Sequence, residues 1–286
     1  MPTKGINYKT CKMKNILFTT EFSEHAESVY RYALELARAF GSTITLGIPF
    51  GKPATSTDIT STDEKKERAI KRLKEFADKH TPDAFKDISL EFDAVHAYPG
   101  EGIIKLCENN SADLLVMSMT GSSAGSDQHF SDTTLNVLHK ASVPVLAIPA
   151  NATFNGLKRL VFSTDFQFKD IIALNMLRRW SEQFNSAIMT IHVLGRQDER
   201  AEDREKMEAL QRAYASNSQM HFKLIPSGKT KEELLDYLED NEAELLAMTT
   251  AKRSGLWSLL ENSTTRKMAR SVKIPLLVVK DQDDIN

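Results

Sequence analysis

Cysteine and long apolar runs are scarce in this 286-residue sequence. Its two cysteines, Cys11 and Cys107, form neither a CxxC pair nor a disulfide framework, which excludes a disulfide-stapled fold and predicts a reducing, cytoplasmic location. No stretch approaches ~18 apolar residues, the length that spans a bilayer, and the N-terminus lacks the apolar core of a signal peptide. We therefore expect no membrane partner and no export, and we interpret residues 1–12 as a flexible lead-in.

The sequence also lacks an excess of either positively or negatively charged side chains. The 37 Lys and Arg oppose 39 Asp and Glu, a formal net charge of -2, so no nucleic-acid partner is predicted. The seven histidines show neither HxH nor HExxH spacing, which argues against a metal site. The sequence has no P-loop, no HxGH motif and no Ser or Cys nucleophile with a spaced partner, so no catalytic residue is predicted.

The sequence does contain a repeat. Residues 112–149 and 243–280 match at a constant offset of 131, which pairs Leu114 with Leu245 and Pro144 with Pro275. Residues 14–22 and 158–166 match at an offset of 144, so the second copy is shorter, and the difference falls near the loop after its second strand. Two copies of one domain explain this pattern, and we predict domains at residues 13–150 and 157–281 with a linker between them.

Apolar segments without alternation recur in both copies and are typical of parallel strands that helices cover on both faces. We predict an α/β fold of two doubly wound five-stranded parallel sheets, and a single continuous sheet would contradict that division. Ser23 is predicted to cap the first helix and Gly41 to end it. Expected strands include residues 14–19, 43–48, 88–95, 187–193 and 220–225, and expected helices residues 62–79, 102–110, 171–184, 199–216 and 231–239.

These segments resemble a known family. The chain is similar to a tandem universal stress protein with two UspA-like domains, across residues 14–149 and 158–280. The resemblance rests on Thr20-Glu21-Phe22-Ser23, Ala112-Asp113-Leu114-Leu115-Val116-Met117, Val143-Pro144-Val145-Leu146 and the twin of each. It implies Rossmann-like domains of the adenine nucleotide alpha hydrolase type, whose final strands pair edge to edge as an intramolecular pseudo-dimer. A further homodimer is left open.

ATP-binding members of this family carry G-x2-G-x9-G-[S/T] after the fourth strand, where glycines and a helix N-terminus receive phosphates. The first copy keeps only Gly121 of the three glycines, and the second keeps none. The resemblance implies these candidate ligand-binding positions: Glu21, Ser118, Gly121, Ser131, Asp132 and Thr133 in the first copy, and Asp165, Val193, Gly228, Met248, Thr249, Lys252, Asn262, Ser263 and Thr264 in the second.

Asp132 counts most against a phosphate in the first copy. A carboxylate ~4 Å from a phosphate oxygen costs roughly 1 to 4 kcal/mol, whereas a helix N-terminus offers an anion only ~0.3–1 kcal/mol. A bound Mg²⁺ that used Asp132 as a ligand would reverse the balance. The second copy, with Lys252 and Ser263, is the better candidate for ATP with Mg²⁺. For the hydroxyl clusters at residues 131–134 and 262–265, simple helix capping is favoured over ligand binding.

Two functional hypotheses remain. In the first, the protein is a non-enzymatic binding or signalling module that acts in stress through an unidentified protein or small-molecule partner. In the second, it binds ATP and is a slow ATPase or autophosphorylating protein that uses Asp165, Lys252, Ser263 and Thr264. His192, inside a predicted strand, is interpreted as a satisfied, partly buried side chain rather than a catalytic base.

Overall fold

The computed structural model describes residues 13–51, 61–120, 131–164, 166, 170–194, 201–225, 230–249 and 273–279. The first half runs β1 (Asn15–Thr19), α1 (Ala26–Phe40), β2 (Thr43–Phe50), α2 (Thr62–His80), a 3-10 turn (Asp83–Phe85), β3 (Leu90–His96), α3 (Pro99–Asn109), β4 (Leu114–Ser118), α4 (Asp132–Lys140) and β5 (Val145–Ile148). The second runs β6 (Arg159–Ser163), α5 (Asp170–Phe184), β7 (Ala187–Val193), α6 (Ala201–Ala213), β8 (Met220–Ile225), α7 (Thr230–Asp240), β9 (Leu245–Thr249) and β10 (Leu276–Val279). This order confirms the predicted α/β class.

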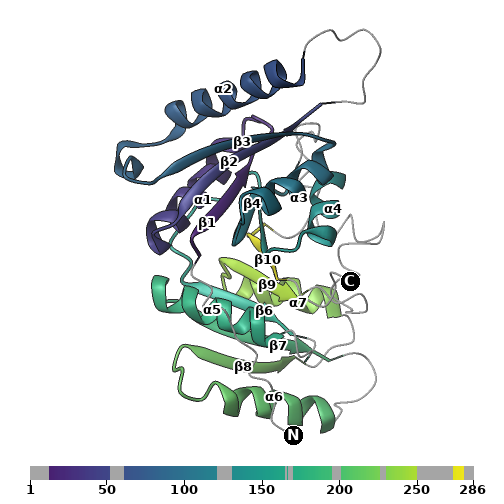
Figure 1. Cartoon of the computed structure of the whole chain (residues 1–286). Helices are drawn as coiled ribbons and strands as arrows, with labels where there is room; N and C mark the ends of the chain where they lie inside the picture. The colour runs from purple at the N-terminus through teal and green to yellow at the C-terminus, as the bar shows by residue number, and fades with distance from the viewer. Residues whose placement is uncertain are drawn as a thin grey trace, which may run out of the picture.

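The ten strands form one sheet in the order β3-β2-β1-β4-β5-β10-β9-β6-β7-β8 (Figure 1). Neighbours are parallel within each half, and β5 and β10 pair antiparallel with Leu146 opposite Leu277. The order reads the same from both ends when each strand is replaced by its repeat partner, as a pseudo-two-fold relation requires. The expectation that the sheets stay separate is wrong, because the edge pairing implied by the family resemblance joins them.

A repeated side-chain contact fixes the start of the first strand in each half. The Asp113 carboxylate accepts hydrogen bonds from the backbone N–H groups of Lys14 and Asn15, at 2.7 and 3.0 Å. In the second half the Glu244 carboxylate accepts from Lys158 and Arg159 in the same way. The acidic residue that precedes the fourth strand of each half thus satisfies donors that would otherwise lack a partner at the sheet margin.

Backbone conformations repeat too. Gly41 ends α1 with φ 64°, as predicted, and Asn185 occupies the same left-handed region (φ 51°) after α5. Phe22 and Phe166, each in the loop after the first strand of its half, both have φ 57°. Ser23 does not cap α1: the helix starts three residues later, after His25, whose side chain makes no capping hydrogen bond. Only the Ser23 carbonyl contributes, by accepting the Ala26 N–H.

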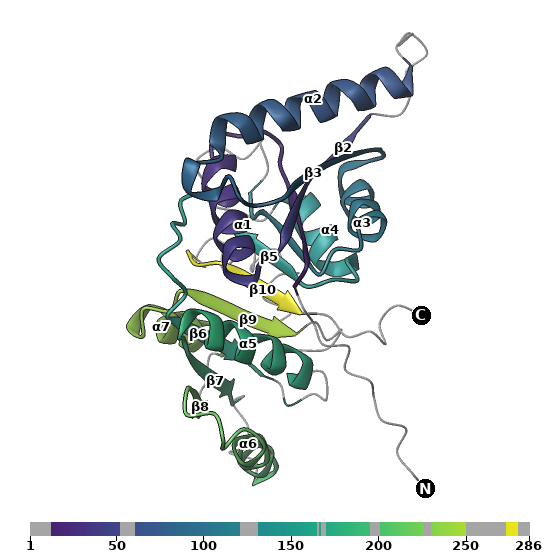
Figure 2. The same cartoon turned by 60° about the vertical axis from the view of Figure 1, so that its left-hand side comes forward.

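Helices cover both faces of the sheet (Figure 2). On one face α1, α2 and α5 bury Leu36, Leu73 and Leu177 against residues such as Phe18 and Phe162. On the other face α3, α4 and α7 bury their apolar sides against the alternate strand residues. Each of the two cores contains residues from both halves, so the halves stabilise each other through the shared sheet. None of the described helices is long and apolar enough to cross a membrane.

The segment between the halves is packed rather than free. The Tyr32 hydroxyl donates to the Thr153 carbonyl at 2.8 Å. The ring of Phe154 lies 5.3 Å from that of Tyr32 and 5.8 Å from that of Phe184, while Phe184 also contacts Trp180. An aromatic cluster from α1, the linker and α5 therefore fixes how the halves meet on this face.

Candidate functional site at the carboxyl edge

In the first half the predicted site residues mostly bond to one another. Ser118, at the end of β4, accepts the Thr120 N–H at 3.2 Å. Ser131, the N-cap of α4, accepts the Thr134 N–H at 3.0 Å, and the Thr134 hydroxyl donates to the Ser118 carbonyl at 3.2 Å. These contacts confirm capping, and they join the end of β4 to the start of α4. The hydroxyls are thus already engaged without a ligand.

The remaining first-half candidates lie around this link. Asp132 is the first residue of α4 and is exposed, Thr133 is half-buried beside it, and Glu21 is exposed after β1. A carboxylate therefore occupies the helix start at which a phosphate would seek N–H donors. Gly121 lies outside the described residues.

The second half holds a buried polar cluster at the same edge. Asp170, the first residue of α5, is only 1% exposed. One of its carboxylate oxygens accepts the Thr164 hydroxyl, and the other accepts the Thr249 hydroxyl at 2.7 Å. Thr164 follows β6 and Thr249 ends β9, so one carboxylate ties two strand ends to a helix. Because both oxygens accept from hydroxyls, the geometry fits the ionised carboxylate.

His192, on β7, completes the cluster. Its Nδ1 lies 2.7 Å from the Thr164 carbonyl oxygen, and since a carbonyl only accepts, Nδ1 carries the proton. Its Nε2 faces the Asp203 carboxylate of α6 at 3.8 Å, and its ring lies against that of Phe166, tilted by 39° with 4.4 Å between centroids. The histidine is satisfied and largely buried, which confirms the structural interpretation of this residue.

Sequence reasoning missed Asp170. Of the second-half residues that the sequence did predict, three lie in the described region: Val193, Met248 and Thr249, all buried at the ends of β7 and β9. Asp165, Gly228, Lys252, Asn262, Ser263 and Thr264 lie outside it. The signal for Asp170 was available, because the offset of 144 pairs it with Ala26, the first residue of α1, which is 4% exposed. An acidic residue at a position that is apolar in the repeat partner marks a feature specific to one half.

The edge shows no cation site within the described ranges: they contain no group of three or more His, Cys, Asp or Glu side chains that could hold a metal ion. The arrangement at the second half is a set of hydroxyl donors turned inward on a carboxylate. Chemically it can orient strand ends, but its donors do not point to an external anion.

Comparisons with known proteins agree with the repeat. The model of the universal stress protein family matches residues 12–149 and again residues 168–280. The chain belongs to this family. The two matches cover most of the sequence and fall on the two structural halves. A search of the curated proteins finds no significant match.

Solved structures share the fold of this universal stress protein along its whole length. A universal stress protein from Archaeoglobus fulgidus is 20% identical with a TM-score of 0.66, and the match covers 96% of this chain and 98% of that one. A functionally unknown protein from Pseudomonas aeruginosa is 15% identical with a TM-score of 0.66, and the match covers 96% and 95%. These likenesses show that the fold is shared along nearly the whole chain, and the antiparallel pairing of β5 with β10 in this structure is consistent with an intramolecular pseudo-dimer.

Proposed function

We propose that this universal stress protein is a non-enzymatic binding or signalling module, in which neither half retains a working ATP site. The observation that carries the proposal is the buried bond between Asp170 and Thr249. Thr249 stands at the first glycine position of the ATP-binding motif implied by the family resemblance. Its hydroxyl is used internally, because it donates to the Asp170 carboxylate at 2.7 Å.

The charge balance favours this proposal in both halves. An ionised carboxylate ~4 Å from a phosphate oxygen costs roughly 1 to 4 kcal/mol; the cost lies toward the upper figure at buried Asp170, where water screens it less, and toward the lower figure at exposed Asp132. Asp132 places such a charge at the start of α4, and Asp170 places one at the end of β9. A helix N-terminus stabilises a bound anion by only ~0.3–1 kcal/mol, which is less than or at most equal to this cost.

A second candidate function is ATP binding by the second half, with slow ATP hydrolysis or autophosphorylation. One observation favours it: His192 fixes the carbonyl of Thr164 at 2.7 Å, directly before Asp165. That contact would orient the acidic residue expected to face adenine. Lys252, Ser263 and Thr264 would then hold the phosphates, with Mg²⁺ supplying charge neutralisation.

Isothermal titration with ATP, with and without Mg²⁺, separates the two candidates. We expect no binding heat at millimolar ATP, whereas submicromolar binding would overturn the non-enzymatic proposal. If heat appears, Lys252→Ala combined with Ser263→Ala abolishes it when the second half is the site. Asp132→Ser removes the repelling carboxylate of the first half and is expected to restore some binding there. A native mass spectrum of the purified protein, read for bound small molecules and for chain stoichiometry, tests for a resident ligand and for a homodimer.

A further inference from the structure

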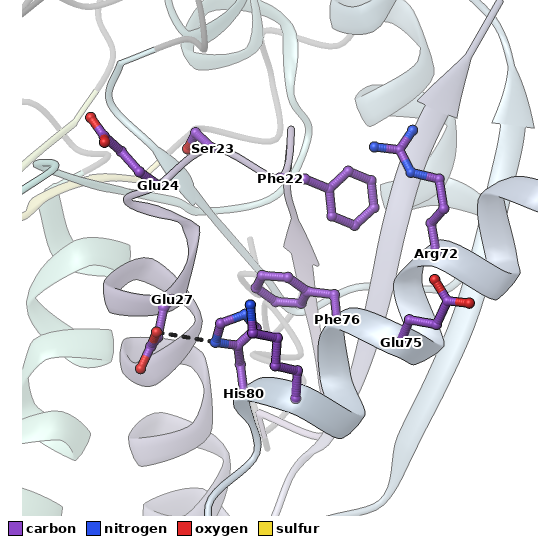
Figure 3. A pocket seen from close by; sticks show the side chains of 9 residues that line it. Phe22, Ser23, Glu24, Glu27, Arg72, Glu75, Phe76 and His80 are labelled. Atoms are coloured by element: carbon purple, nitrogen blue, oxygen red, sulfur yellow. Dashed lines mark hydrogen bonds and ion pairs between the residues drawn. The ribbon is translucent and has the colours of Figure 1, made fainter.

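A pocket of about 490 Å³ opens on the first half, between the start of α1 and one face of α2 (Figure 3). It is separate from the strand-end hydroxyl clusters described above. Its size falls within the roughly 300–1,000 Å³ of small-molecule sites. The lining residues come from the loop after β1, from α1 and from α2: Phe22, Ser23, Glu24, Glu27, Arg72, Glu75, Phe76, Lys79 and His80.

Two phenylalanine rings form the apolar part of this pocket. Phe76 is 9% exposed and packs on Phe18 and Tyr30, with 6.1 and 5.5 Å between ring centroids, so its position is fixed by the core. Phe22 meets Phe76 edge-on at 5.9 Å. The left-handed backbone of Phe22 is held by its own N–H, which donates to the Thr20 hydroxyl at 2.9 Å. A ligand would therefore meet a preformed aromatic surface.

Charges of opposite sign stand on opposite sides of these rings. Glu24 and Glu27 lie on the α1 side (Figure 3), and each carboxylate contacts an imidazole: Glu24 that of His25 at 3.2 Å and Glu27 that of His80 at 3.1 Å. Among the residues that the structure describes, neither carboxylate has a Lys or Arg partner in an ion pair.

The α2 side carries the positive charges. The Arg72 guanidinium lies 4.3 Å over the Phe22 ring, and Lys79 lines the pocket about two helical turns further along α2. Within the described part of the chain neither makes an ion pair. Glu75 is the third acidic residue of the lining, and its carboxylate forms an ion pair with Lys71 at 3.9 Å. A ligand with only one sign of charge would leave one side of the pocket uncompensated.

We propose that this pocket binds a small zwitterion with an apolar body, namely a free α-amino acid with a large apolar side chain. Its ammonium group faces Glu24 and Glu27, its carboxylate faces Arg72 and Lys79, and its side chain packs on the phenylalanine rings. At the equivalent position of the second half, the Phe166 ring instead lies against the His192 ring, with 4.4 Å between centroids. The proposed site does not depend on nucleotide binding.

Saturation-transfer NMR on the full chain tests this proposal with L-phenylalanine as the probe. A ligand of this size has an expected dissociation constant in the millimolar range. Phenethylamine lacks the carboxylate and phenylpropionate lacks the ammonium group, and each is expected to bind roughly two- to fivefold more weakly, since exposed ion pairs are worth that much. Changing the ligand tests the charges without any risk to the fold.

Arg72→Met and Glu27→Gln are the matching protein variants, each expected to weaken L-phenylalanine binding by about the same factor. Lys74→Met is the control, because Lys74 lies on the same helix over the Phe92 ring and outside the pocket. The proposal fails if L-phenylalanine gives no saturation transfer near its solubility limit. It also fails if phenethylamine or phenylpropionate binds as tightly as L-phenylalanine, or if Lys74→Met weakens binding as much as Arg72→Met. Titration of the same sample with ATP tests the proposed function, and its outcome is independent of the outcome for L-phenylalanine.

Discussion

The Asp170 carboxylate accepts the Thr249 hydroxyl at 2.7 Å across 79 residues of sequence, inside a cluster that solvent does not reach. The other carboxylate oxygen accepts the hydroxyl of Thr164, which in turn accepts the Phe166 N–H at 3.0 Å. The ends of two strands are thus positioned by one side chain. In the first half the equivalent position is Ala26, so this link distinguishes two otherwise similar domains.

Removing the Asp170 carboxylate should destabilise the protein. Asp170→Ala leaves two buried hydroxyls without an acceptor, and each such group costs about 1–3 kcal/mol. Thr249→Val in the Asp170→Ala background should then cost less than it does alone, with a coupling of about 1–2 kcal/mol. Urea unfolding of the four proteins of this cycle gives the coupling. Ser118→Ala, at the position equivalent to Thr249, is the control, and additive effects of Asp170→Ala and Thr249→Val would contradict the cluster.

Ser131 should contribute to stability whether or not a ligand is present. Because its hydroxyl accepts the Thr134 N–H at 3.0 Å, Ser131→Ala is expected to lower the free energy of unfolding by about 1 kcal/mol. Ser131→Asn keeps an acceptor and should stay close to the parent protein. Thermal unfolding followed by circular dichroism compares the three. Equal losses for the two variants would show that capping is not the role of this side chain.

Cys107 should make stability fall at alkaline pH. Burial, reinforced by Glu108, raises the pKa of its thiol to about 12, whereas an exposed thiol titrates near ~8.5. The folded chain thus keeps a proton that the unfolded chain releases. The stabilising contribution is complete below about pH 8.5 and is lost as the pH rises toward 12, at up to ~1.4 kcal/mol per pH unit. Urea midpoints between pH 8 and about 9.5, below the range in which tyrosines titrate, measure this slope, and Cys107→Ala should flatten it.

Phe154 should stabilise the junction between the halves. It packs on Tyr32 and Phe184, so Phe154→Ala is expected to lower the free energy of unfolding by about 2 kcal/mol. Tyr98, which is 54% exposed, provides the control: Tyr98→Ala should change stability by less than about 0.5 kcal/mol. Urea unfolding compares the variants. A loss at Phe154 no larger than that at Tyr98 would mean that the linker contributes no packing energy.

Local rules determined much of this protein from its sequence. Parallel strands such as β7, the end of α1 at Gly41 and the cap at Ser131 depend on residues within a few positions of one another, and the pattern of apolar residues records them directly. The constant offsets of 131 and 144 between matching segments reveal the repeat from the sequence alone. Ser23 was predicted wrongly as a cap because the backbone at Phe22 turns through a left-handed conformation that delays the helix.

Only the tertiary structure decided what depends on distant segments. The joining of two sheets at Leu146 and Leu277, the burial of Asp170 between Thr164 and Thr249, and the pocket between α1 and α2 each need residues far apart in sequence to meet. An acidic residue at a helix start is ordinary surface by local rules. It becomes the link between two strand ends because the crossover topology brings those ends together, where a charge removed from water must find donors.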